Sequence, residues 1–179
     1  MLVSKQASMS NDEASGYPPE SDASIRIASA SDAARICDVL IRSVREVCAP
    51  DYGNDPSILD SWCSNKTPES IAKWIQNPDN FFIVAELEPQ GIVGAALYNR
   101  AEASINLCYL VPEGLHRGIG SRLLCAIEVE ARRLGHRQIT LDSSITAHEF
   151  YKRHGYQDNG EPVYWHKVLG FPMRKLLAV

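Results

Sequence analysis

Two glycines at the start of an amphipathic helix constrain the fold of this 179-residue chain more than any other feature. A strand is predicted over 104–111, Pro112 ends it, and Gly118 and Gly120 open a helix that runs to about residue 134. The apolar residues of this helix lie on one side, and Gly135 is placed to terminate it. A further strand at 138–141 completes a strand-helix-strand unit, whose crossover is expected to be right-handed.

Hydrophobic periodicity predicts more elements around this unit. Strands are expected over 24–27, 81–86, 92–98, 163–166 and 172–176. Helices are expected over 36–47, around Leu59 and Trp62, from Thr67 to about 76, and over 146–154. A Glu-Pro-Gln-Gly turn at 88–91 joins two of the strands as a hairpin. The order of elements predicts a mixed α/β domain.

Composition and charge exclude several classes of protein. A formal net charge of -4 is unlike the basic excess of proteins that hold nucleic acid, so no nucleic-acid partner is expected. No apolar run reaches the roughly 20 residues that span a bilayer, so no membrane association is expected. The five cysteines form no Cys-x-x-Cys pair, which argues against a zinc site, and no metal is predicted.

The first residues of the chain differ from the rest in composition. Residues 1–23 are rich in Ser, Pro, Asp and Glu, and are expected to form a disordered tail. The start of the sequence contains no apolar core of a secretory signal, so a cytoplasmic location is expected. Residues 24–179 are long enough for one domain with a sizeable core and too short for two.

The strand-to-helix turn is suited to binding an anion. The first turn of a helix has backbone N–H groups without partners, and the helix dipole adds partial positive charge there. Glycines let an anion approach this backbone, and Arg117 and Arg122 can add charge-assisted bonds to phosphate. The stretch is neither a P-loop nor a complete dinucleotide fingerprint, because no Gly-Lys-Ser/Thr follows and position 123 is Leu. A tight turn without a ligand is the alternative interpretation.

Two stretches together resemble the cofactor motifs of the GNAT superfamily of N-acetyltransferases. Residues 111–124 are similar to the family's strand, Val-x-Pro and (Gln/Arg)-x-x-Gly-x-(Gly/Ala) motif, followed by an apolar helix. Residues 144–156 look like its Asn-x-x-Ala-x-x-x-Tyr-x-x-x-Gly-(Phe/Tyr) element. The resemblance implies a GNAT-like fold, with a central mixed sheet of six to seven strands flanked by helices on both faces. It also implies acetyl-CoA as cosubstrate.

The resemblance assigns roles to individual residues. Leu110 and Val111 would offer backbone groups to the thioester and the pantetheine arm, and residues 116–121 would hold the pyrophosphate. The implied cofactor-binding residues are Leu110, Val111, His116, Arg117, Gly118, Ile119, Gly120, Ser121, Arg122 and Ser144. Tyr151 matches the family tyrosine that protonates the leaving thiolate, and a phenol with an ordinary pKa near 10 is suited to this task. Packing beside Phe150 is the alternative role for this ring.

The sequence departs from the family pattern at three positions. Leu115 replaces the Gln or Arg of the motif, Ser144 replaces Asn, and Ser104 stands where some members have a carboxylate base. Glu102, two residues earlier, is the predicted catalytic base. Three further routes for the proton of the amine stay open, through Glu46, Asp51 or a water chain at Asn106.

The implied activity is direct transfer of an acetyl group to a primary amine in a ternary complex, the acceptor being a small molecule or a protein. The acceptor side is expected near Asp51, Tyr52, Trp62, Trp74 and the strand 164–166. A non-catalytic acyl-CoA sensor is one alternative, and an anion- or nucleotide-binding domain unrelated to acyl transfer is another. Many relatives pair as homodimers, but no heptad pattern or apolar edge in this sequence requires one.

Overall fold

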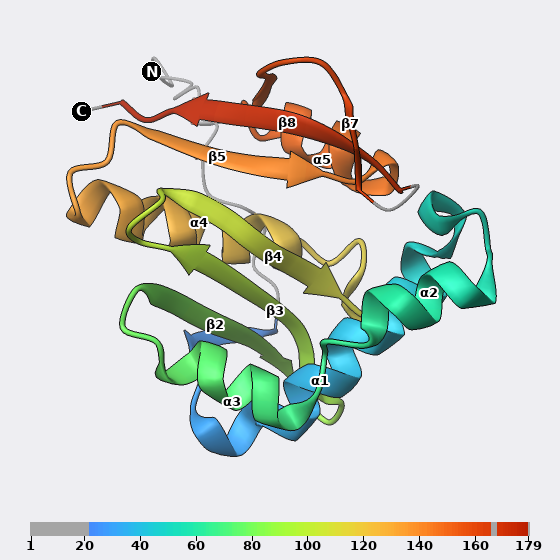
Figure 1. Ribbon diagram of the computed structural model, residues 1–179. Coiled ribbons are helices and arrows are strands. Elements are labelled where there is room, and N and C mark those ends of the chain that lie inside the picture. The colour runs from blue at the N-terminus through green and yellow to red at the C-terminus, as the bar shows by residue number, and fades with distance from the viewer. Residues whose placement is uncertain (1–21, 166–167, 179) are drawn as a thin grey trace, which may run out of the picture.

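The computed structural model describes residues 22–165 and 168–178, which form a mixed sheet with helices on both faces (Figure 1). The strands are β1 (Ser24–Ile27), β2 (Asn80–Leu87), β3 (Gly91–Asn99), β4 (Ser104–Leu110), β5 (Gln138–Ser143), β6 (Gln157–Asp158), β7 (Val163–Trp165) and β8 (Val168–Leu176). Seven of them are ordered β1-β2-β3-β4-β5-β8-β6, and β7 pairs with β8. Only the β4–β5 pair is parallel within the described chain.

Helices connect and cover these strands. They are α1 (Ala33–Arg42), α2 (Pro56–Cys63), α3 (Pro68–Gln76), α4 (Ile119–Arg133) and α5 (Ile145–Arg153), with short 3-10 turns at Ala30–Asp32, Ala49–Tyr52 and Pro112–Gly114 and a π-helical turn at Ser43–Val47. Thr67 caps α3 as the sequence indicates, its Oγ1 accepting from the Ser70 backbone N–H. No helix in the described part of the chain is long and apolar enough to cross a membrane.

The predicted fold class is confirmed, and the differences lie in short or irregular segments. β6 was not predicted, because two residues are too few to show a hydrophobic period. β8 begins at Val168 rather than near residue 172. The predicted strand 163–166 is found as Val163–Trp165, and His166 lies outside the described residues. Ala23, which the sequence assigned to the tail, is buried and accepts a hydrogen bond from Arg122 through its carbonyl.

The two faces of the sheet have separate hydrophobic clusters. α4 and α5 pack on one face, where Ile119, Leu123, Leu124 and Ile127 of α4 are almost completely buried. α1 and α3 pack on the other face against alternate residues of β2, β3 and β4. The amphipathic pattern of α4 therefore places its glycine-containing start directly beside the end of β4.

The central parallel pair separates along its length. β4 and β5 are paired only at Ser104↔Thr140 and Ile105↔Leu141. β4 stays paired with β3 as far as Leu110, and β5 stays paired with β8 as far as Ser143. The pairing of β3 with β4 changes register so that Asn106 is an extra residue, and such bulges bend a strand. The sheet therefore divides beyond Ile105, as the diverging arrows of β4 and β5 show (Figure 1).

Candidate functional site

A cavity of about 720 Å³ lies where β4 and β5 separate. β4 supplies one wall from Ile105 to Leu110, and the turn before α4 supplies another. The remaining walls come from α5, the end of β5, strands β7 and β8, and the segment from Ser43 to Trp62. Cys108 and Leu110 pack on the α4 side of the sheet, whereas Leu107 and Tyr109 pack on the α1 side. β4 thus forms the boundary between the two sides of the site.

The turn before α4 presents backbone N–H groups to this cavity. His116 and Gly118 both have left-handed backbone conformations, with φ of 58° and 71°. No side chain caps the helix at Gly118, so the N–H groups of the first turn are left for another acceptor. Because a helix N-terminus carries partial positive charge, the turn is suited to binding an anion at the cavity wall.

Gly120 allows α4 and α5 to approach each other closely at this point. A Cβ atom at position 120 would lie 3.2 Å from the Phe150 ring and 3.4 Å from a Leu110 methyl group. One turn later on α5, His154 Nε2 lies 2.8 Å from Ser121 Oγ, and its Nδ1 lies 2.8 Å from the Phe150 carbonyl. Sequence reasoning missed His154. The only signal was its place one residue before Gly155 in the second motif.

Tyr151 faces the cavity from α5 and is buried, with 6% of its surface exposed. Its ring contacts Phe150 and Tyr156 edge to face. Burial raises the pKa of the Tyr151 hydroxyl well above its ordinary value, and the neighbouring Cys108 thiol adds to this effect. Burial also raises the pKa of the Cys108 thiol, to about 11. The cavity therefore contains a neutral phenol, placed beside a sulfur atom, that can donate a proton or a hydrogen bond.

Most of the predicted cofactor residues line this cavity. Those that do so are Leu110, His116, Gly118, Ile119, Gly120, Ser121 and Ser144. Ser144 also caps α5, since its hydroxyl accepts from the Ala147 N–H. Arg153, which was not predicted, lines the cavity as well and supplies a positive charge to its wall.

Three predicted cofactor residues lie elsewhere. Val111 is buried in the core, with its N–H bonded to the Val93 carbonyl. Arg117 is exposed and is absent from the cavity wall. Arg122 donates to the Ala23 carbonyl beside β1 and is likewise absent from the wall. The spacing of the motif could not reveal that the Val111 N–H is already bonded, or which way the two arginine side chains point.

The position of Glu102 does not support its predicted role as the catalytic base. Glu102 lies in the turn between β3 and β4, where its N–H bonds to Asn99 Oδ1. This turn is at the opposite end of β4 from Leu110, a distance of roughly 20 Å at about 3.3 Å per residue. The strand does not extend back to position 102, because Ala103 adopts a left-handed turn conformation with φ of 52°. Glu102 is also absent from the residues that line the cavity.

The other candidate carboxylates are also engaged elsewhere. Glu46 is bonded to Arg42, and Asp51 Oδ1 accepts from the backbone N–H and the hydroxyl of Thr146. Asp142, near the end of β5, is the carboxylate that lines the cavity among the described residues. Asp142 is exposed between buried Leu141 and buried Ser143, so it lies on the opposite face of β5 from them.

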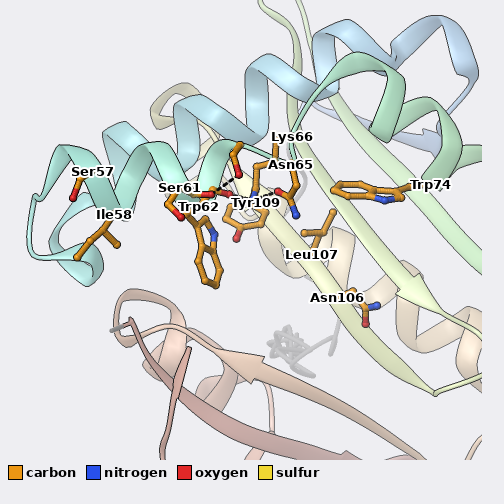
Figure 2. A pocket seen from close by; sticks show the side chains of 11 residues that line it. Ser57, Ile58, Ser61, Trp62, Asn65, Lys66, Trp74, Asn106, Leu107 and Tyr109 are labelled. Atoms are coloured by element: carbon orange, nitrogen blue, oxygen red, sulfur yellow. Dashed lines mark hydrogen bonds between the residues drawn. The ribbon is translucent and has the colours of Figure 1, made fainter. Parts of the chain in front are cut away.

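A second cavity, of about 660 Å³, lies on the α1 side of β4 (Figure 2). Trp62 of α2, Trp74 of α3 and Asn106 of β4 line it, together with Lys66 from the loop after α2. The two cavities share four lining residues, namely Trp62, Asn106, Leu107 and Tyr109. The site thus has two compartments that meet at β4.

The residues expected on the acceptor side are divided between these compartments. Trp62 and Trp74 line the second cavity, and Tyr52 and Trp165 line the first. Asp51 lines neither, and Tyr164 is 74% exposed. Within residues 22–165 and 168–178, no three His, Cys, Asp or Glu side chains are grouped as metal ligands.

Comparisons with known proteins agree with this geometry. Residues 48–177 match the family described as "Acetyltransferase (GNAT) domain". The chain is 27% identical over 133 residues to the "Uncharacterized N-acetyltransferase YafP" of Escherichia coli K12, covering 70% of this chain and 75% of that protein.

Solved structures of other acetyltransferases share the fold. A GCN5-related N-acetyltransferase structure from Rhodopseudomonas palustris has a TM-score of 0.77 at 23% identity, covering 90% of this chain and all of that one. The PaiA N-acetyltransferase of Thermoplasma acidophilum, solved with coenzyme A, has a TM-score of 0.70 at 22% identity, covering 87% of this chain and 99% of that one. With the family match extending over more than half of the sequence, the chain belongs to the GNAT family of N-acetyltransferases.

Proposed function

We propose that this protein transfers the acetyl group of acetyl-CoA directly to a primary amine, with both substrates bound at once. The observation that carries the proposal is the pair of cavities that meet at Asn106–Tyr109 of β4. Acetyl-CoA would occupy the first cavity, with its pyrophosphate at the start of α4. The amine would enter from the second cavity.

The chemical groups that line the first cavity are suited to binding acetyl-CoA. Its turn offers uncapped backbone N–H groups between His116 and Ser121, and Arg153 adds a positive charge. The edge of β4 beyond Ile105 is not paired with β5, so it can bond to an extended pantetheine arm as a neighbouring strand would.

In the proposed reaction the amine nitrogen attacks the acetyl carbonyl carbon, an amide bond forms, and the carbon–sulfur bond breaks. Tyr151 gives its proton, or a strong hydrogen bond, to the departing sulfur. Asp142 accepts the proton that the amine loses, directly or through water. Most of the acceleration would come from holding the two reactants together at β4.

A Tyr151→Phe variant tests the proposal. CoA release from acetyl-CoA is measured with a panel of amines, alongside thermal stabilisation by acetyl-CoA. The variant is expected to lose about 100-fold or more in kcat and to keep its stabilisation by acetyl-CoA. Tyr164→Phe, which changes an exposed tyrosine, is the matched control and is expected to leave both unchanged.

Two outcomes would contradict the proposal. Stabilisation by acetyl-CoA without CoA release for any amine would favour a non-catalytic sensor. Equal turnover by the wild type and Tyr151→Phe would remove Tyr151 from the mechanism. Because the chain has five free cysteines, an enzyme-only blank is needed with thiol reagents.

A further inference from the structure

The second cavity contains one charged side chain. Its walls are made of hydroxyl, amide, aromatic and aliphatic groups, apart from the ammonium group of Lys66 (Figure 2). Within the described chain no carboxylate lies within 4.0 Å of this ammonium group. The compartment that receives the amine is therefore positively charged.

The Lys66 ammonium group is held in place without being neutralised. Its Nζ donates to the Trp62 carbonyl at 2.6 Å and to Asn65 Oδ1 at 3.2 Å, and it lies 5.5 Å from the centre of the Trp62 ring. Only 7% of the residue is exposed, and this burial lowers the pKa of Lys66. An ammonium group has three N–H donors, so one remains beyond the two bonds described. Burying a charge without a counter-charge is unfavourable, so an anion bound beside Lys66 would stabilise its ammonium group.

The rest of the cavity is suited to an apolar group of moderate size. Trp62, Trp74 and Tyr109 supply aromatic surface, and Ile58 and Leu107 supply aliphatic surface. Trp62 Nε1 is buried and has no hydrogen-bond partner among the described residues. Trp62 lines both cavities, so its ring lies at their boundary.

We propose that the amine acceptor is a small molecule that also carries a carboxylate and an apolar body, as an apolar amino acid does. The carboxylate would pair with Lys66, the body would lie against Trp62 and Trp74, and the amine would face β4. This inference rests on the proposed transferase function. A polyamine or aminoglycoside would bring further positive charge to a compartment that already contains a cation and no carboxylate. A phosphate, with nearly two negative charges, would meet only one cation.

The direct test compares amines that differ only in the carboxylate. Acetyl-CoA-dependent CoA release is measured with L-phenylalanine, L-phenylalaninamide, phenethylamine, O-phosphoethanolamine and spermidine. L-phenylalanine is expected to exceed its amide in kcat/KM by about tenfold or more, as expected for a hydrogen bond to a charged group. Equal or better turnover of the amide, O-phosphoethanolamine or spermidine would overturn the proposal.

Variants at Lys66 separate charge recognition from support of the loop. Lys66→Met is expected to lower kcat/KM for L-phenylalanine about tenfold or more, with little change for the amide. Lys66→Arg keeps the positive charge and is expected to restore most of the preference. Lys73→Met removes an exposed lysine from α3 and is the matched control. An equal loss for both amines in Lys66→Met would mean that Lys66 only supports the loop.

A binding measurement distinguishes failure of this inference from failure of the proposed function. N-acetyl-L-phenylalanine and its amide are titrated calorimetrically into the protein with CoA present. Tighter binding of the acid by about tenfold, lost in Lys66→Met, is expected whether or not turnover is seen. If amines are turned over but neither assay shows a preference for the acid, the proposed transferase function stands. The proposed recognition of a carboxylate by Lys66 is then wrong.

Discussion

His154 Nε2 lies 2.8 Å from Ser121 Oγ, so one side-chain contact joins the end of α5 to the first turn of α4. His154 Nδ1 lies 2.8 Å from the Phe150 carbonyl, and a hydrogen on Nδ1 leaves Nε2 to accept from the Ser121 hydroxyl. The imidazole therefore fixes the position of the turn that presents its N–H groups to the cavity.

Replacing His154 should weaken acetyl-CoA binding more than it slows the chemistry. In His154→Ala the KM for acetyl-CoA is expected to rise about threefold to tenfold, the loss of about one hydrogen bond, while kcat changes little. Ser121→Ala should show a smaller rise of the same kind. His148, which stacks on Phe171 and bonds to Asp158, lies outside the cavity, so His148→Ala is the control. A fall in kcat with unchanged KM would contradict this positional role.

Asp142 and Glu102 offer a matched pair of carboxylates for identifying the base. Asp142 lines the cavity, whereas Glu102 lies at the far end of β4. At neutral pH, Asp142→Asn is expected to lower kcat/KM about 100-fold, and Glu102→Gln is expected to leave it unchanged. The deficit of Asp142→Asn should shrink as the pH approaches the pKa of the acceptor amine, because a neutral amine can attack without first being deprotonated. A deficit that stays constant with pH would assign Asp142 to positioning instead.

Gly118 has a backbone conformation that favours glycine. Its φ of 71° lies in the left-handed region, which costs a non-glycine residue about 1–2 kcal/mol. Gly118→Ala is therefore expected to lower the free energy of unfolding by about that amount and to raise the KM for acetyl-CoA severalfold. Gly135→Ala, at a φ of 77° with open space around the new Cβ, should cost similar stability and leave the KM unchanged. Chemical denaturation and steady-state kinetics measure both effects.

The sequence predicts well the helices and strands whose apolar residues follow a clear pattern. Burial determines both this pattern and the type of secondary structure. The apolar side of α4 and the strands β2 and β3 are found as expected, and both strands are buried over most of their length. The motif correctly locates the turn at Gly118, where the left-handed backbone favours glycine, and at Gly120, where the Phe150 ring leaves little room for a side chain. The residue types at these two positions are set by their immediate surroundings.

Features that depend on long-range pairing could not be predicted. β4 and β5 separate because each stays paired with its other neighbour in the sheet beyond Ile105. No residue of β4 indicates this pairing by itself. The same holds for Asp142 and Lys66, since each faces its cavity only because other elements form the opposite wall. Glu102 was chosen by its distance along the chain, and the turn conformation at Ala103 takes it out of the strand.

Five of the seven tyrosines should resist ionisation until the protein unfolds. Burial raises the pKa of Tyr98 and of Tyr109 to about 12, and it also raises the pKa of Tyr52, Tyr151 and Tyr156 above the ordinary value. In the unfolded chain their pKa values return to about 10. Above pH 10 the unfolded state therefore releases protons that the native state retains, and stability falls by about 1.4 kcal/mol per pH unit for each such tyrosine.

Alkaline titration should show this as one cooperative step. Phenolate absorbance and far-ultraviolet circular dichroism are followed together from pH 8 upward, beyond the ordinary tyrosine pKa of about 10. The absorbance of these five tyrosines is expected to rise together with loss of helix signal, within about two pH units of 10. The exposed Tyr164 marks the behaviour of a tyrosine that is not buried, and Tyr164→Phe should leave the cooperative step in place. Gradual ionisation of all tyrosines near pH 10, with the helices intact, would show that solvent reaches the site around Tyr151 freely in the native state. Tyr151 would then not be the buried, neutral phenol that the proposed proton transfer requires.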